Sequence, residues 1–395
     1  MKKISVSGIT ISITLIMGTS TFLGYAFGVL GPDLIREFSL SRSELGLATT
    51  VSFVIGGFGS ILAGRFVDKI GVRKITIYAM MIVAVSLLLI SVTTNYLFIL
   101  ALSAFAGITL AFGNPITNKV IAHEIPTRIR GPITGIKQSG VQLGASAAGF
   151  VLAPLVVIFG WRIGLALTVL IPVTALLLSL IFIPERKIEE QYKTATRKLP
   201  KPVYLIAIYG FFNGAAISCL TAYLPLYFVE SLNFSLSAAG ALFGTFGIVA
   251  LFARVFWGWL AGKVQIGREL LITMAIIAAL GIVLISYGNI FNIWIIWAAT
   301  LLLGITAMSW NSVGMLMVIN GVDKSATGQA TGVVLFGFYV GIASSPVFFG
   351  FLVDRFASYQ VAWSFVAILF ALSTISLLKK FEIKNSLSLQ SLKSD

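Results

Sequence analysis

Hydrophobic residues dominate this chain in long runs, which are separated by short polar stretches. A run of roughly 17 to 25 apolar residues is long enough for a helix to cross a lipid bilayer. Each run is expected to be helical, because lipid leaves unpaired backbone groups unsatisfied. The chain holds twelve such runs, near residues 8–30, 45–64, 75–93, 96–118, 132–158, 163–183, 202–229, 238–260, 270–288, 291–319, 327–352 and 360–378.

Part of the chain is repeated. The stretch 107–144 recurs without a gap at 304–341. The identical pairs are Gly107/Gly304, Ile108/Ile305, Thr109/Thr306, Asn114/Asn311, Gly131/Gly328, Thr134/Thr331, Gly135/Gly332, Gly140/Gly337 and Gly144/Gly341. Because glycine lets helix backbones approach closely inside a bilayer, the repeated glycines indicate that two halves pack by one plan.

The duplication reaches the first spans as well, since Phe38-Ser39-Leu40-Ser41 matches Phe234-Ser235-Leu236-Ser237. We therefore predict an all-α polytopic membrane protein with twelve transmembrane helices in two pseudo-symmetric halves. The six-helix halves are expected at 1–183 and 202–379. A polar cytoplasmic linker is expected at 184–201 and a cytoplasmic tail at 380–395. Two such halves favour a transporter.

Composition excludes an ordinary soluble protein. The chain is 58% hydrophobic and 11% charged, whereas a soluble domain carries about 25% charged residues. The net charge of +14 raises the question of a nucleic-acid partner. However, the basic residues outside the spans follow membrane topology, and only Arg36, Arg42, Arg162 and Arg355 fall on the outer side. This bias places both termini in the cytoplasm and argues against nucleic acid.

The chain offers little for catalysis or metal binding. Cys219 is the only cysteine, so an internal disulfide is impossible, and His123 is the only histidine. No paired carboxylates lie within the spans. General acid/base, metal or nucleophilic chemistry is therefore not expected, and we predict a protein that is not an enzyme and needs no cofactor.

A charged loop follows the second span: Gly64-Arg65-Phe66-Val67-Asp68-Lys69-Ile70-Gly71-Val72-Arg73-Lys74. Its glycines, acid and basic cluster resemble the signature loop of the major facilitator superfamily, which implies that superfamily's fold and alternating access around a central cavity. A generic basic loop explains the cations but not Asp68 between spaced glycines.

The gating candidates in this loop are Gly64, Asp68, Gly71 and Arg73. A carboxylate at a helix end can accept from the backbone N–H groups at a neighbouring helix N-terminus and pair with Arg, as a latch that one conformation makes and another breaks. The second copy has Gly262 in place of the acid, so the predicted gate is one-sided.

Lys137 and Arg254 are the charged residues inside the predicted spans, which contain no Asp or Glu. An ionisable group at bilayer depth costs about 2.5 to 3.5 kcal/mol, so such a cation usually faces water, a partner or a substrate. Alternatively, Lys137 could extend its side chain to the cytoplasmic membrane interface, because helical rise places it only roughly 7 to 8 Å from Pro132, where the predicted span begins.

Arg254 lies in Ala253-Arg254-Val255-Phe256-Trp257-Gly258, which resembles the helix-eight pattern of monocarboxylate and oxalate transporters. The resemblance implies that this arginine holds the substrate carboxylate, a task that suits its planar fork. It also implies that helices five and eight are neighbours, so the two cations would approach across the cavity. At ~6 Å they would repel by roughly 3 kcal/mol, which a bound anion would reverse.

Other branches fit less well. Resemblance to nitrate carriers would imply arginines on helices two and eight, but Ser60 stands at the helix-two position symmetric with Arg254. Drug antiporters commonly carry an arginine on helix four, but Ser103 stands at that site. Phe243 occupies the region where animal monocarboxylate carriers place an aspartate, which argues against carboxylate-based proton coupling.

Polar and aromatic cavity candidates are Tyr25, Asn114, Gln138, Gln142, Asn213, Tyr223, Tyr227, Trp310, Asn311 and Tyr339. The Asn114/Asn311 pair stands out because it is duplicated, although hydrogen bonding between helices explains it equally well.

We thus predict a monomeric plasma-membrane transporter of a small, monocarboxylate-like organic anion, acting by secondary active or facilitated transport. The alternative is a major facilitator efflux pump for apolar or drug-like compounds.

Overall fold

In the computed structural model every regular element of the described residues is a helix. The structure describes residues 5–185, 198–264, 266–288, 290, 292–322 and 326–378. Most of the predicted linker and all of the predicted tail lie outside these residues. The helices are α1 Val6–Phe38, α2 Arg42–Ile70, α3 Val72–Val92, α4 Tyr96–Glu124, α5 Arg130–Ala147, α6 Ala153–Leu167, α7 Leu170–Phe182, α8 Lys201–Glu230, α9 Leu236–Val264, α10 Gly267–Ser286, α11 Ile293–Thr306, α12 Trp310–Asn320, α13 Thr327–Phe356 and α14 Tyr359–Ser376, with short helical segments η1 Thr127–Ile129, η2 Ala148–Leu152 and η3 Ala307–Ser309.

Within the described ranges, ten helical stretches are long and apolar enough to cross a membrane, and α2 makes eleven if its bent halves form one span. One of the ten is the 56-residue stretch Thr127–Phe182, which holds both the fifth and the sixth predicted span. Gly160 interrupts that stretch with a φ of 78° and a ψ of 160°, values that only glycine adopts easily. The all-helical membrane fold predicted from the sequence is therefore confirmed.

Local sequence sets the helix boundaries. Ser41 and Glu44 form a reciprocal capping box that starts α2, each side chain bonding to the other residue's backbone N–H. Asn95 starts α4 by accepting from the N–H of Leu97. Gly71, with a φ of 96°, separates α2 from α3, so the glycine of the charged loop permits a turn that other residues rarely adopt.

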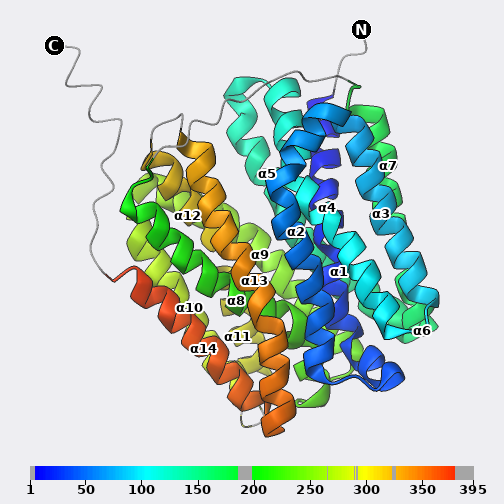
Figure 1. The fold of residues 1–395 in the computed structure, drawn as a ribbon. Helices are drawn as coiled ribbons and strands as arrows, with labels where there is room; N and C mark the ends of the chain where they lie inside the picture. The colour runs from blue at the N-terminus through cyan, green and yellow to red at the C-terminus, as the bar shows by residue number, and fades with distance from the viewer. Residues whose placement is uncertain are drawn as a thin grey trace, which may run out of the picture. The chain divides into compact units, whose positions relative to one another are not determined.

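The described helices belong to two compact units, and each is considered by itself (Figure 1). Unit 1 comprises residues 1–190, 220–248 and 346–357. It contains α1 to α7 together with the end of α8, the start of α9 and the end of α13. Unit 2 comprises residues 191–219, 249–345 and 358–395, and so contains the remainder of those three helices with α10, α11, α12 and α14. Three helices therefore begin in one unit and end in the other.

Each unit repeats one helix packing with its own glycines. In unit 1, a Cβ on Gly140 of α5 would lie 2.1 Å from the carbonyl oxygen of Thr14 on α1. In unit 2, a Cβ on Gly337 of α13 would lie 2.6 Å from the carbonyl oxygen of Ala207 on α8. These two glycines are an aligned pair in the duplicated sequence. The same backbone approach thus occurs twice, as the repeat predicts.

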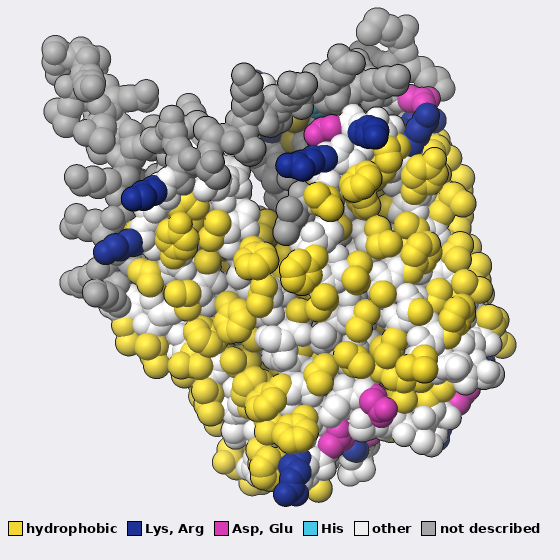
Figure 2. Space-filling view, in the orientation of Figure 1, with side chains coloured by type: hydrophobic (Ala, Val, Ile, Leu, Met, Phe, Trp, Pro, Cys, Tyr) yellow, Lys and Arg dark blue, Asp and Glu magenta, His cyan; other side chains and the backbone are white. Residues whose placement is uncertain are grey.

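The helices of unit 1 carry apolar side chains on their exposed sides. On α3, the exposed large hydrophobic residues include Tyr78, Met81, Leu88 and Val92. In Figure 2 hydrophobic side chains cover the middle of these helices, while charged side chains gather near helix ends. An apolar face of this kind is what lipid contact requires.

Candidate functional site

Lys137 is a buried cation inside unit 1. Its side chain is 1% exposed, so it does not reach the interface as the alternative interpretation of the sequence allowed. The Nζ atom donates to Asn114 Oδ1 at 3.0 Å, to Thr117 Oγ1 at 2.9 Å and to Asn118 Oδ1 at 2.7 Å. All three acceptors are neutral oxygens. The amine is therefore held at a fixed point without a carboxylate among these contacts.

The three acceptors share one face of α4 because they follow at spacings of three and four residues. The helix α5 presents Lys137 to that face while Gly140 and Gly144 pack on α1: a Cβ on Gly144 would lie 2.8 Å from the carbonyl oxygen of Gly18. Gly140 and Gly144 follow Lys137 at spacings of three and seven residues, so the close packing on α1 lies on nearly the same face of α5 as the lysine.

Arg254 lies in unit 2 and is 9% exposed. Its Nη2 donates to the carbonyl oxygen of Met308 at 3.1 Å. One turn further along α9, Trp257 Nε1 donates to the carbonyl oxygen of Ile305 at 2.8 Å. These carbonyls lie where α11 gives way to η3, a break that leaves backbone oxygens in need of donors. Arg254 therefore helps to hold the broken helix that contains Asn311.

Two amides in unit 2 retain unused acceptors among the described residues. Asn213 Oδ1 and Asn311 Oδ1 are buried and have no hydrogen-bond partner in that part of the chain. Asn213 Nδ2 lies 3.5 Å from the hydroxyl oxygen of Tyr209, which itself donates to the carbonyl of Leu271. A buried amide oxygen without a donor is costly, and it marks a place where a polar ligand gains a bond.

The remaining binding candidates fall in both units. In unit 1, Tyr25 is buried with its ring centroid 6.3 Å from that of Phe243, and Gln142 and Tyr227 are buried. Gln138 is half-buried on α5. In unit 2, Tyr339 is half-buried beside Phe338. The structure thus groups Lys137 with Asn114, while the predicted approach of Lys137 and Arg254 stays a prediction because they lie in different units.

The gating candidates all lie in unit 1. Asp68 forms an ion pair with Lys119 of α4. Arg73 Nη2 donates to the carbonyl oxygen of Leu180 on α7 at 2.9 Å. Gly64 has open space where a side chain would begin. The charged loop is thereby tied to α4 and α7 through its acid and one of its cations.

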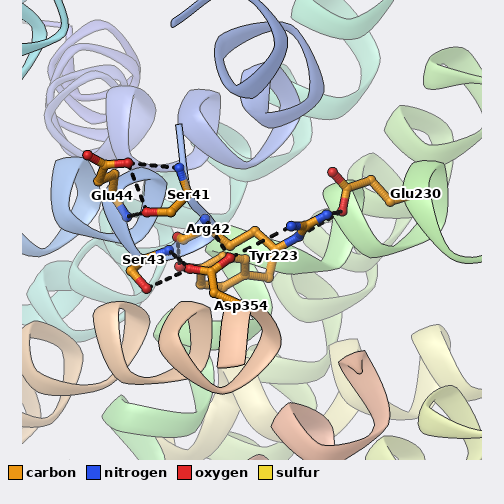
Figure 3. A network of polar contacts seen from close by, with 7 residues as sticks. All are labelled: Ser41, Arg42, Ser43, Glu44, Tyr223, Glu230 and Asp354. Carbon is orange, nitrogen blue, oxygen red and sulfur yellow. Dashed lines mark hydrogen bonds and ion pairs between the residues drawn. The ribbon is translucent and has the colours of Figure 1, made fainter. Parts of the chain in front are cut away.

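The latch geometry that we predicted for Asp68 is adopted by Asp354, at the end of α13. Asp354 accepts from the backbone N–H of Arg42 at 3.0 Å and from that of Ser43 at 2.9 Å, and from Ser43 Oγ at 2.7 Å (Figure 3). Its negative charge lies at the N-terminus of α2, where the exposed amides favour an anion. Two segments that are 311 residues apart are joined in this way.

The side chain of Arg42 extends the same cluster to α8. Its Nε and Nη2 donate to Glu230 Oε2 at 3.1 and 2.9 Å. Figure 3 shows the guanidinium of Arg42 extending from α2 toward Glu230 on α8. The hydroxyl oxygen of Tyr223 lies 2.6 Å from the carbonyl oxygen of Arg42 and 2.7 Å from that of Pro346, so its proton is shared between them. We call this cluster the Arg42 network: Ser41, Arg42, Ser43, Glu44, Tyr223, Glu230 and Asp354.

A second charged cluster lies at the end of α1. Glu37 accepts from Arg162 and from Trp161 Nε1. Burial by itself raises the pKa of Glu37, but the hydrogen bonds from Trp161 and Arg162 outweigh it, so that the pKa lies below its ordinary value. The residues of the sequence Gly160-Trp161-Arg162 therefore anchor α6 to α1.

Sequence reasoning missed Thr117, Asn118 and the Arg42 network. The spacing of Asn114, Thr117 and Asn118 within an apolar run was a visible signal for a polar helix face. The pairing of Arg42 with Glu230 and Asp354 had no such signal, because acids and bases at span ends are numerous.

Comparison with known proteins agrees with this architecture. The chain is similar to the probable sulfoacetate transporter SauU of Cupriavidus necator, at 25% identity over 370 residues that cover 84% of each chain. It is 26% identical over 160 residues to the 4-hydroxybenzoate transporter PcaK of Pseudomonas aeruginosa, covering 40% of this chain and 36% of that protein. The chain thus spans only about a third of the length of that relative.

A solved structure gives the same result for the fold. The crystal structure of a D-xylose-proton symporter superposes with a TM-score of 0.79 and 17% identity, covering 96% of this chain and 98% of that one. Residues 11–346 match the profile of the Major Facilitator Superfamily. The chain therefore belongs to the Major Facilitator Superfamily and is a multi-pass membrane protein.

Proposed function

We propose that this protein transports a small, monocarboxylate-like organic anion across the plasma membrane by alternating access. The observation that carries the proposal is Lys137. It is a buried cation whose three hydrogen bonds all go to neutral oxygens, in spans that contain no Asp or Glu. A charge inside a bilayer protein calls for a compensating charge, and an anionic substrate supplies it.

The relatives support an anion as the substrate class. These relatives are named as transporters of 4-hydroxybenzoate, gallate, sulfoacetate and nitrate or nitrite. Each of these solutes is negatively charged at neutral pH. The relatives differ in the size and shape of the solute but agree in its sign, which is the property that a fixed lysine and a fixed arginine select.

Arg254 is proposed as the second anion contact. Its guanidinium carries five N–H groups in a planar fork, one of which donates to Met308, and such a fork suits a carboxylate. Asn311 lies shortly beyond Met308 and brings an amide to the same broken helix. Within unit 2 these side chains form the polar patch on which a carboxylate would gain most, and Asn213 and Tyr339 are proposed to line it.

Alternating access is supported by the Arg42 network. It ties the start of α2, in the first sequence half, to the ends of α8 and α13, in the second. These contacts close one end of unit 1, so a passage at that end requires Arg42 to release Glu230 and Asp354. We propose Asp68 with Gly64, Gly71 and Arg73 as the gate at the opposite helix ends, where Asp68 would exchange its bond with Lys119.

Topology completes the proposal. The distribution of basic residues supports both termini, the linker and the Asp68 loop in the cytoplasm, and in this topology the Arg42 network would lie on the outer side of the plasma membrane. The twofold sequence repeat supplies the two six-helix halves that rock against each other within one monomer.

The test is counterflow in liposomes that contain the purified full-length protein. Liposomes are loaded in turn with lactate, pyruvate, oxalate, 4-hydroxybenzoate or a neutral drug, and entry of the labelled compound is measured. The wild type is compared with Lys137→Gln and Arg254→Gln. We expect counterflow of at least one acid, and a loss of at least tenfold in each variant. Lys263→Arg, a change on the exposed end of α9, is the matched control.

Two outcomes would overturn the proposal. Acid counterflow that is unchanged in both variants would remove the two cations from the binding site. Counterflow confined to the neutral drug would favour the efflux alternative instead.

A further inference from the structure

Lys137 is surrounded in a way that distinguishes its two protonation states. An ammonium group has three N–H donors and no acceptor, and the α4 face offers it three oxygens at 2.7 to 3.0 Å. A neutral amine has only two N–H donors, so one of these oxygens would lose its partner. Adding or removing a proton therefore changes the hydrogen bonding of the pocket by one bond.

Among the described residues, none of the hydrogen-bond acceptors of the Lys137 ammonium carries a negative charge. On α4, the contacts are Asn114, Thr117 and Asn118, and the next cation, Lys119, is paired with Asp68 of α2. On α5 itself, the Arg130 side chain donates to the backbone carbonyls of Ala122 and Ile125.

The other helices that pack on α5 also present uncharged groups. From α1 these are Thr14, Met17 and Gly18, and from the part of α9 in unit 1 it is Gly247, while Gly240 and Gly244 pack beside η2, the continuation of α5. Within the described residues, the positive charge on Lys137 has two routes to compensation: an anion joins it or the proton leaves.

We propose that Lys137 carries the coupling proton of an anion–proton symport, an inference that rests on the proposed function. On the side of uptake, the Nζ lone pair takes a proton from water and forms an N–H bond. The resulting ammonium then attracts the anion. On the side of release, the anion leaves, the N–H bond breaks and the proton returns to water. The carrier reorients empty with an uncharged amine, so one proton and one monovalent anion move together without net charge.

The duplication fixes the expected stoichiometry. At the spacing that pairs Gly140 with Gly337, Lys137 corresponds to Val334, and Thr117 and Asn118 correspond to Gly314 and Met315. The second copy thus lacks both the amine and two of its three acceptors. One proton per transport cycle follows, because the site exists in one half only.

The experiment uses the full-length protein in liposomes with an acidic exterior and a neutral interior. Labelled lactate and 4-hydroxybenzoate are the probes, and trapped pyranine reports internal pH. A gradient of one pH unit corresponds to about 1.36 kcal/mol, so a one-to-one symport drives about tenfold accumulation of the anion. Protein-free liposomes correct for acid that crosses the lipid unaided.

Lys137→Arg separates charge from proton release, because arginine stays protonated in proteins. We expect counterflow of this variant to be lower than that of the wild type but still measurable, since its cation still attracts the anion. We expect its gradient-driven accumulation to fall from about tenfold to none. We also expect wild-type counterflow to decline with rising pH, as the ammonium loses its proton, and counterflow of the variant to lack this decline. Lys263→Arg should behave as the wild type in every assay.

The wild type alone provides a second measurement, which stands if Lys137→Arg fails to fold. At equal pH on both sides, external anion should acidify the interior, and the proton flux should equal the anion flux. Counterflow without any internal acidification would overturn the coupling while leaving the proposed function intact. Full gradient-driven accumulation by Lys137→Arg would overturn it as well. Absence of acid counterflow in the wild type would instead be a failure of the proposed function.

Discussion

Cations at the helix ends and cations within the spans are held in different ways. At the ends, Arg42 pairs with Glu230, Arg162 with Glu37 and Lys119 with Asp68. Within the spans, Lys137 bonds to neutral side-chain oxygens, and the Arg254 guanidinium bonds to the backbone carbonyl of Met308. Among the described residues, the carboxylates of these ion pairs lie near helix ends, and the predicted spans contain no Asp or Glu.

The difference separates charges that hold the molecule together from charges that are available to a solute. A partly exposed ion pair is worth roughly 0 to 1 kcal/mol and can be broken and remade at little cost, which suits a gate. A buried cation bonded to neutral oxygens is costly to keep. Its retention points to a task in which its charge is used.

The largest expected effect comes from Lys137→Met, which removes the buried charge altogether. Transport should fall roughly 10- to 100-fold, because a charge-assisted hydrogen bond contributes about 1.5 to 3 kcal/mol. The melting temperature in detergent should stay level or rise, since a costly buried charge has gone. Parallel uptake and thermal unfolding measurements check both signs. A variant that transports normally but unfolds earlier would show that Lys137 is only a structural tie to α4.

Arg254→Lys should cost about tenfold in uptake. The variant keeps the charge but loses the planar fork that donates to Met308 and, in the proposed site, would also donate to a carboxylate. Concentration dependence of uptake distinguishes the outcomes: a higher KM with an unchanged maximal rate indicates lost anion contact. A KM equal to that of the wild type would show that Arg254 does not contact the anion and only holds η3 through Met308.

Asp354→Asn should open the Arg42 network, with an effect of a few fold. The isosteric amide keeps the shape but weakens the bonds to the amides of Arg42 and Ser43. In a Cys219→Ser background, Leu45→Cys provides a buried probe on α2. Maleimide labelling of this cysteine should accelerate several-fold when Asp354→Asn is added. An unchanged labelling rate would remove the network from the opening motion.

Glu37→Gln should have the smallest effect. Because the folded state lowers the pKa of Glu37 below its ordinary value of 4.5, this carboxylate stabilises the protein above that value and loses its contribution as pH falls through the lower one. The melting temperature of the wild type should exceed that of the variant slightly near neutral pH. The gap should close in acid and shrink in salt. A gap that widens in acid would contradict the sign.

The sequence predicted the fold well because helices in lipid leave few choices. Apolar run length, the glycine repeat and the position of basic residues sufficed to predict the all-helical duplicated architecture. It also singled out Lys137, but it left open whether that side chain is buried or reaches the interface. It could not show that Lys137 meets Thr117 and Asn118, because helix rotation decides which face of α4 receives the amine. The sequence also could not show that Asp354 accepts from the backbone N–H groups at the start of α2. Asp68 and Asp354 both lie beside a helix end, and only tertiary packing decides which acid meets a helix N-terminus.

The sharing of α8, α9 and α13 between the two compact units has a consequence for how this protein loses its structure. The boundaries fall inside continuous helices, at 219/220, 248/249 and 345/346, rather than in loops. Melting one unit must fray three helices of the other, so neither has an independent cooperative transition. Calorimetry on the intact chain should give one heat-absorption peak, and protease nicking in the linker should not divide it into two.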